Sequence, residues 1–166
     1  SPSVGTSCDV NYLDLGCGAG ATLAMAYLLL NAKPHGVEIQ PELVQAGGQW
    51  FSTAASSQQL RVLSPAFEYM KRNTFCADIR DAAIVVKLIS EADLIFTNNI
   101  KFDFPDSKGG NKVKPLNAVI VDLLCQHMRR PGACCVATAP LAIKPPLRLV
   151  KGFEFPKNSF DWHLEG

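Results

Sequence analysis

The sequence has no long apolar run and no excess of charge of one sign. No stretch approaches the roughly 20 consecutive apolar residues that a membrane-spanning helix requires, and the polar start Ser1-Pro2-Ser3 is unlike a signal peptide. The 16 basic and 15 acidic side chains leave a formal net charge of only +1. These absences argue against a membrane partner and against an overall electrostatic field that would attract nucleic acid.

Paired cysteines are also missing. The chain has six cysteines but no C-x-x-C pair and no cluster of cysteine with histidine, so the sequence predicts no metal centre. We expect reduced thiols that pack as small apolar side chains, as in a soluble intracellular protein. The six are Cys8, Cys17, Cys76, Cys125, Cys134 and Cys135.

What is present is the composition of one folded domain. The 166 residues are 48% hydrophobic and 19% charged, which suits a chain that buries a substantial core. No internal repeat or low-complexity segment divides the chain. We therefore expect residues 1–166 to form a single domain.

A glycine-rich turn follows an apolar stretch near the start of the chain. Residues 12–15 are typical of a strand, and Gly16, Gly18 and Gly20 alternate in the segment that follows. Residues 21–30 are apolar and rich in helix formers, so a helix is expected directly after the turn. Glycine permits a positive φ and lets the backbone approach a ligand, and the first N–H groups of the helix point to the same place.

Two acidic residues indicate which ligand this turn would bind. Glu38 ends a second expected strand, where an α/β nucleotide-binding fold places an acid on the ribose hydroxyls. Asp14, two residues before Gly16, would repel a pyrophosphate but could accept a hydrogen bond from an ammonium group. This turn resembles the first motif of class I S-adenosylmethionine-dependent methyltransferases, whose cofactor carries an amino group and no phosphate. The alternative is a tight strand–helix turn beside a surface glutamate.

Strand and helix signals alternate along the rest of the chain. Repeated strand–helix units predict an α/β, Rossmann-like fold with a mainly parallel sheet and helices on both faces. The expected strands after the first are residues 35–39, 73–77, 93–97, 133–138 and 147–155. The expected helices are residues 21–30, 41–55, 65–71, 82–90 and 116–129.

Four polar residues fall at or just after the ends of expected strands: Asp14, Glu38, Asp78 and Asn98. Ligands of parallel sheets lie beyond the carboxyl ends of the strands, so these side chains are expected to converge on one crevice. Each could instead cap the helix that follows it, as Asp and Asn often do.

Several segments resemble one methyltransferase family. Residues 92–102, A-D-L-I-F-T-N-N-I-K-F, are similar to the V-I-F-V-N-N-F-x-F segment of the disruptor-of-telomeric-silencing family, the non-SET histone-lysine methyltransferases. Residues 131–141 resemble its glycine turn, strand and proline-containing loop, and residues 159–162 resemble its late S-x-S-W motif. The resemblance extends, in order, over roughly residues 11–162.

The resemblance implies S-adenosylmethionine as cofactor. Gly16 and Gly18 would contact it through the backbone, Asp14 would hold its amino group, Glu38 its ribose hydroxyls and Asp78 its adenine amine. Ile79 would offer the adenine an apolar contact. The implied cofactor-binding residues are Asp14, Gly16, Gly18, Glu38, Asp78, Ile79 and Asn98.

The resemblance also implies a channel for a lysine acceptor. Phe102 and Trp162 would line this channel, and Asn98 would stand where it meets the cofactor. A narrow apolar channel disfavours charged lysine, whose free pKa is about 10.4, and so helps to produce the neutral amine that attacks the methyl group. Phe102 and Trp162 could instead be ordinary core residues.

The function implied is methylation of a lysine on the nucleosome core face of histone H-three, which implies a nuclear protein. A loop with Lys108, Lys112 and Lys114 is a candidate contact for nucleosomal DNA or a solvated insertion. The alternatives are a class I methyltransferase with an arginine, RNA or small-molecule acceptor, and a non-catalytic cofactor-binding module. Ile100 replaces an aromatic of the family pattern, and family segments expected upstream and downstream are absent, so we expect a core truncated at both ends.

Overall fold

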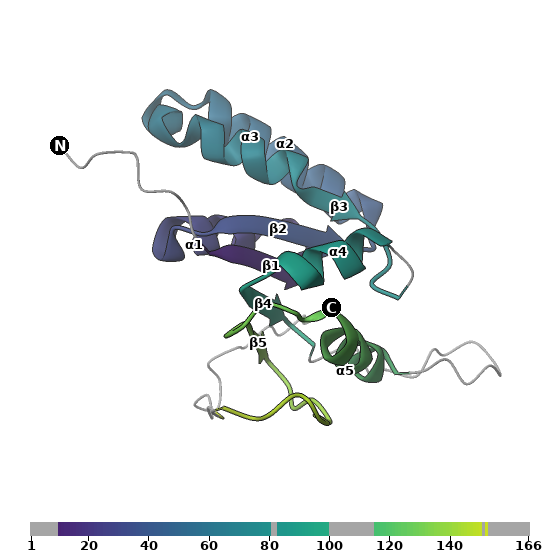
Figure 1. Ribbon diagram of the computed structural model, residues 1–166. Coiled ribbons are helices and arrows are strands. Elements are labelled where there is room, and N and C mark those ends of the chain that lie inside the picture. The colour runs from purple at the N-terminus through teal and green to yellow at the C-terminus, as the bar shows by residue number, and fades with distance from the viewer. Residues whose placement is uncertain (1–9, 81–82, 100–114, 151, 153–166) are drawn as a thin grey trace, which may run out of the picture.

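A parallel five-stranded sheet forms the centre of the fold in the computed structural model, which describes residues 10–80, 83–99, 115–150 and 152 (Figure 1). The strand order is β3-β2-β1-β4-β5. The strands are β1 (Asn11–Leu15), β2 (Lys33–Glu38), β3 (Thr74–Cys76), β4 (Leu94–Thr97) and β5 (Cys134–Ala137). The predicted α/β, Rossmann-like class with a parallel sheet is confirmed.

The strand order places a reversal beside β1. The chain moves outward from β1 to β2 and β3, then returns to the other side of β1 to form β4 and β5. Such a reversal opens a crevice at the carboxyl ends of the central strands, where ligands of doubly wound sheets bind. The segment after Leu15 lies at this edge, since β1 is paired with β2 on one side and β4 on the other.

Helices cover both faces of the sheet. On one face are α1 (Ala21–Leu30), α2 (Pro41–Ser56) and α3 (Ser64–Arg72), with the 3-10 helix η1 (Gln58–Leu63) between the last two. On the other are α4 (Ala83–Glu91) and α5 (Leu116–His127). Figure 1 shows α2 and α3 side by side above the sheet and α5 below it.

Residue alternation along β1 divides the core into two clusters. Tyr12 packs with α1, α2 and α3, whereas Leu13 and Leu15 pack with α4 and α5. Because side chains of a strand alternate between faces, Asp14 lies on the same face as Tyr12 and points toward the α1 side. The buried side chains around Tyr12 include Leu23, Phe51 and Met70.

Helix α1 has the predicted bounds but is only partly covered. It contains no charged residue, and a helix that is apolar all round is normally buried on all sides. Leu23 is fully buried, yet Leu28 is 56% and Leu29 is 73% exposed. Tyr12 and Phe96 line a groove of about 270 Å³ with the same outer face of α1.

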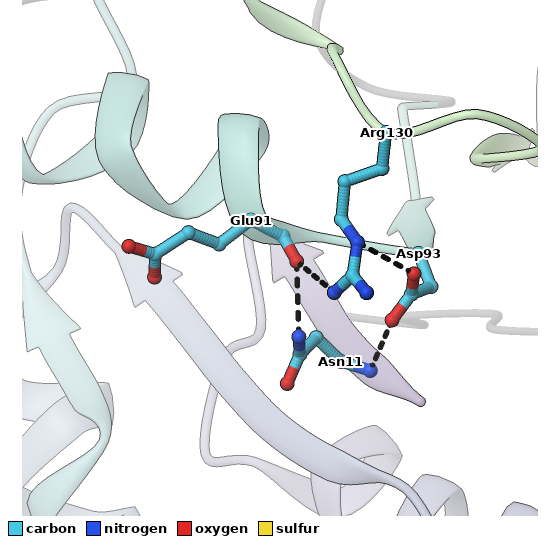
Figure 2. Close-up of polar contacts among 4 residues, drawn as sticks. All are labelled: Asn11, Glu91, Asp93 and Arg130. Atoms are coloured by element: carbon cyan, nitrogen blue, oxygen red, sulfur yellow. Dashed lines mark hydrogen bonds and ion pairs between the residues drawn. The ribbon is translucent and has the colours of Figure 1, made fainter. Parts of the chain in front are cut away.

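A cluster of polar contacts ties the sheet together at its opposite edge (Figure 2). Oδ2 of Asp93 accepts a hydrogen bond from the backbone N of Asn11 at 2.8 Å, and its Oδ1 lies 3.0 Å from Nε of Arg130. The carbonyl of Glu91 accepts from Nδ2 of Asn11 at 3.1 Å and from a guanidinium N of Arg130 at 3.0 Å. These contacts join the starts of β1 and β4, the end of α4 and the turn before β5.

The later strands differ from the sequence expectations in burial and in extent. The buried strand predicted at 133–138 forms as Cys134–Ala137. Cys134 and Val136 are exposed, however, because none of the described helices covers the part of the α1 face of the sheet over β5. The predicted strand at 147–155 does not form over residues 147–150, and the rest lies largely outside the described residues.

In the described parts of the chain, no helix is both long enough and apolar enough to cross a membrane.

Candidate cofactor-binding site

The glycine turn after β1 has the backbone conformation that the sequence predicted. Gly16, Gly18 and Gly20 have φ values of 89°, 55° and 85°, in the left-handed region that other residues rarely adopt. The backbone N of Gly16 and that of Cys17 both donate to the carbonyl of Val37, at 2.8 and 3.1 Å. The turn is therefore held against the end of β2.

The glycines of the turn serve different purposes. A Cβ on Gly20 would lie 2.8 Å from Cζ of Phe51, so this position is closed by packing of α2. A Cβ on Gly18 would meet no atom within 4 Å. Gly18 thus faces open space beyond the sheet edge, where a ligand could approach its backbone.

Glu38 lies directly beside this opening, at the end of β2. Its side chain is buried, with Oε2 accepting from the backbone N of Gly18 and Oε1 from that of Gln40, both at 2.9 Å. A carboxylate oxygen can accept more than one hydrogen bond, so Glu38 can hold the turn and still accept from ligand hydroxyls. The proximity of Glu38 and Gly18 fits the predicted arrangement.

Asp14 has an oxygen without a partner. The residue is 1% exposed, and its Oδ2 accepts a hydrogen bond from the hydroxyl of Thr22, while its Oδ1 has no hydrogen-bond partner among the described residues. Burial raises the pKa of Asp14, the Thr22 hydrogen bond lowers it and the charge of Glu38 raises it, so that the pKa moves from 3.8 to about 7. A buried acceptor without a donor is costly, so the site favours a ligand that donates a hydrogen bond there.

Asp78 and Ile79 follow β3 at the same edge of the sheet. Oδ1 of Asp78 accepts from the backbone N of Arg80 at 2.8 Å and lies 3.9 Å from Nε of the same residue. Ile79 is buried in the cluster with Leu13 and α4. Their contacts with an adenine stay predictions.

The two asparagines after β4 have different surroundings. Asn98 is exposed, and its Oδ1 accepts from the hydroxyl of Thr138 at 2.8 Å. Asn99 is 1% exposed, and it bridges to Ala139 in both directions and to Asn117. Asn98 is thus available at the carboxyl edge, whereas Asn99 fastens β4 to the segment after β5.

Several predicted site residues lie outside the described residues. Phe102 and Trp162 are among them, so the acceptor channel stays a prediction, as does the loop with Lys108, Lys112 and Lys114. Conversely, the sequence reasoning missed Thr22 and Asn99 as polar partners of this edge. No sequence pattern marked Thr22 as a site residue. Asn99 belongs to the Asn98-Asn99 pair, and that pair was the pattern that could have indicated it.

The thiol in the turn is not a reactive group. Cys17 is buried and packs against Gly36 of β2. A Cβ added to Gly36 would lie only 2.6 Å from the sulfur of Cys17. Burial raises the pKa of Cys17 to about 12, with the charges of Asp14 and Glu38 adding to the effect, so the thiol stays protonated. In the described ranges, no three His, Cys, Asp or Glu side chains are grouped to hold a metal ion.

Comparison with known proteins gives structural likeness only. No family model matches the chain. No curated protein matches it either.

The chain is similar to solved structures at low sequence identity. Fibrillarin from Aeropyrum pernix, in complex with natively bound S-adenosyl-L-methionine, has 17% identity and a TM-score of 0.47 over 77% of this chain and 44% of its own. Geranyl diphosphate C-methyltransferase from Streptomyces coelicolor, with S-adenosyl-L-homocysteine, has 15% identity and a TM-score of 0.45 over 73% of this chain and 35% of its own.

A third similar structure is an RNA methyltransferase from Salinibacter ruber with S-adenosyl-L-homocysteine. It has 20% identity and a TM-score of 0.46 over 78% of this chain and 67% of its own. The chain spans less than half the length of the first two structures. Likeness at this level assigns no activity, and none of the three points to the histone-lysine family.

Proposed function

We propose that this chain binds S-adenosylmethionine at the carboxyl edge of β1 and β2 and forms the core of a methyltransferase. The observation that supports this most is the buried, unpartnered Oδ1 of Asp14 at the end of β1, directly before the turn that leaves Gly18 open. Residues 11–32 include no Lys or Arg, so the turn offers a phosphate no cationic side chain. The site therefore suits a ligand with an ammonium group and ribose hydroxyls better than a dinucleotide.

Each residue of the proposed site has a distinct task. Asp14 accepts from the ligand's ammonium group, and Glu38 accepts from the two ribose hydroxyls. Gly18 brings backbone close to the ligand without a side chain. Asp78 and Ile79 contact the adenine, and Asn98 orients the methionine part near the end of β4.

The cofactor supplies a methyl group on a positively charged sulfur. In such a transfer, a lone pair of the acceptor would form a bond to the methyl carbon as the carbon–sulfur bond breaks and its electrons return to the sulfur. An amine acceptor must first lose a proton, which an apolar environment promotes by disfavouring the charged amine. No metal is needed in this step.

The finer proposal is that the acceptor is a lysine of histone H-three on the nucleosome. It is supported by the resemblance of residues 92–102 and 159–162 to the histone-lysine family. With it we propose a nuclear location, Phe102 and Trp162 as channel walls, and a contact of the lysine-rich loop with DNA. Arginine, RNA or a small molecule is the alternative acceptor, and a non-catalytic cofactor-binding module is the alternative role.

Binding of the cofactor is tested by calorimetry with Glu38→Ala. We expect S-adenosylmethionine and its demethylated product to bind the unmodified chain, and the variant to bind more weakly by roughly 1.5–3 kcal/mol, the range for bonds to charged groups. Glu42→Ala removes an exposed acid at the start of α2 and is the matched control. Equal affinity in Glu38→Ala, or preferential binding of NAD, would contradict the proposed site.

The acceptor is tested by transfer of labelled methyl groups onto nucleosomes, free histones and RNA in parallel. Labelling of histone H-three in nucleosomes is expected. Labelling of RNA alone would support the alternative acceptor. Cofactor binding without any transfer would support the non-catalytic module.

A further inference from the structure

Thr22 stands between the buried acid of the site and the apolar groove of α1. It is the second residue of α1, and its hydroxyl donates to Oδ2 of Asp14. It also lines the groove beside Tyr12. The hydrogen bond from Thr22 occupies Oδ2 of Asp14, and Oδ1 of the same carboxyl group has no hydrogen-bond partner among the described residues.

The protons of this cluster can be assigned from the number of donors. Thr22 has one hydroxyl proton, and an ionised Asp14 has none to give, so that proton lies on the bond to Asp14. Tyr12 lies beside Thr22 in the lining of the groove. Burial, and then the charge of Asp14, raise the pKa of Tyr12, so the phenol keeps its proton.

We propose that Thr22 is a positioning residue for cofactor binding: its hydroxyl holds Oδ2 of Asp14, so that Oδ1 is presented to the ligand's ammonium group. This inference rests on the proposed function and adds a residue to it. The hydroxyl thus orients the acid and also stabilises the anionic form that an ammonium group needs.

The arrangement makes binding depend on pH. The ammonium group pairs with ionised Asp14, whose pKa is about 7, so affinity increases as pH rises through that value. Other titratable groups that act on this cluster are Glu38 of β2, Tyr12 of β1 and Cys17 of the turn. The register neighbours Gly36 and Phe96 carry no charge.

The test compares Thr22→Val, which keeps the shape and removes the donor, with Thr22→Ser, which keeps a hydroxyl. Two probes are titrated by calorimetry from about pH 5.5 to pH 9: S-adenosylhomocysteine, which carries the ammonium group, and methylthioadenosine, which lacks it. Loss of the donor should move the pH midpoint for S-adenosylhomocysteine upward by about one unit and weaken binding at neutral pH about tenfold. Thr22→Ser should recover most of the loss, and methylthioadenosine should bind both variants alike.

The outcomes separate this inference from the proposed function. An unchanged pH midpoint in Thr22→Val, or equal weakening of both probes, would overturn the positioning role while leaving the cofactor site in place. Failure of both probes to bind the unmodified chain would overturn the proposed function and this inference with it. A carboxyl-carbon NMR titration of Asp14 without ligand gives a second readout, in which Thr22→Val must raise the pKa of Asp14.

Discussion

Asp14 shows at the scale of one residue how a site can oppose stability. Its carboxyl group is buried and feels the charge of Glu38, and among the described residues only the Thr22 hydroxyl bonds to it. Ionising such a group costs free energy that a surface aspartate does not incur. A protein commonly tolerates this cost where the group binds a ligand.

The sign of the resulting pH dependence follows from the pKa of Asp14. Because its pKa is raised from 3.8 to about 7 on folding, the folded chain binds more protons than the unfolded chain between these values. Stability therefore falls as pH rises through this window, by at most about 4 kcal/mol from this residue. We expect Asp14→Asn to raise the free energy of unfolding at pH 8 and to change it little near pH 4, as measured by urea denaturation.

One control variant and one further measurement accompany the Asp14 prediction. Glu42→Gln changes the same kind of charge at an exposed position and should leave the pH dependence as it is. Asp14→Asn should also lose most affinity for a ligand with an ammonium group. A variant less stable than the unmodified chain at pH 8 would contradict the cost assigned to buried Asp14.

At the scale of an element, α1 combines a packed side with an uncovered one. Leu23 is fully buried in the core cluster that contains Tyr12 and Phe51, whereas Leu29 is 73% exposed and lines the groove. The two residues have the same side chain on the same helix, so they differ only in burial. A leucine side chain that stays exposed to water adds little to the free energy of unfolding, because it removes little apolar surface from water.

The two leucines give a matched test of this difference. Leu23→Ala should lower the free energy of unfolding by about 2–5 kcal/mol, because it leaves a cavity in the cluster around Phe51. Leu29→Ala should change it by no more than about 0.5 kcal/mol. Equal losses in chemical denaturation would mean that the outer side of α1 is packed in solution.

At the scale of the whole molecule, the two edges of the sheet have different tasks. The carboxyl edge carries the candidate site, with its turn, its acids and the open Gly18. The opposite edge carries the contacts of Asp93 with Asn11 and Arg130, which join strands distant in sequence (Figure 2). Changes at this second edge should alter stability without altering the site.

The prediction for this edge uses two variants of Asp93. Asp93→Ala removes the acceptor for the Asn11 backbone and the partner of Arg130, and should cost about 1–3 kcal/mol in thermal or chemical unfolding. Asp93→Asn keeps an acceptor and loses only the part-exposed ion pair, so it should cost less than about 1 kcal/mol. Cofactor affinity should be unaffected in both, and a large loss of affinity would contradict the separation of the two edges.

The features that the sequence alone determined are local ones. The alternating Gly16, Gly18 and Gly20 predicted a turn of positive φ because only glycine adopts this conformation readily. Residues 21–30 predicted α1 at its observed bounds, and strand–helix alternation predicted the parallel sheet. Each of these follows from propensity and spacing within a few turns of chain.

Tertiary structure alone decided which side chains meet and which are covered. The sequence did not indicate that Thr22 would bond to Asp14, because the contact depends on how α1 returns over β1. Nor did it show that Asn99 is the buried member of its pair, or that Leu29 and Val136 are exposed. Burial depends on what the remaining elements cover, and that is a property of the assembled layers rather than of any single segment.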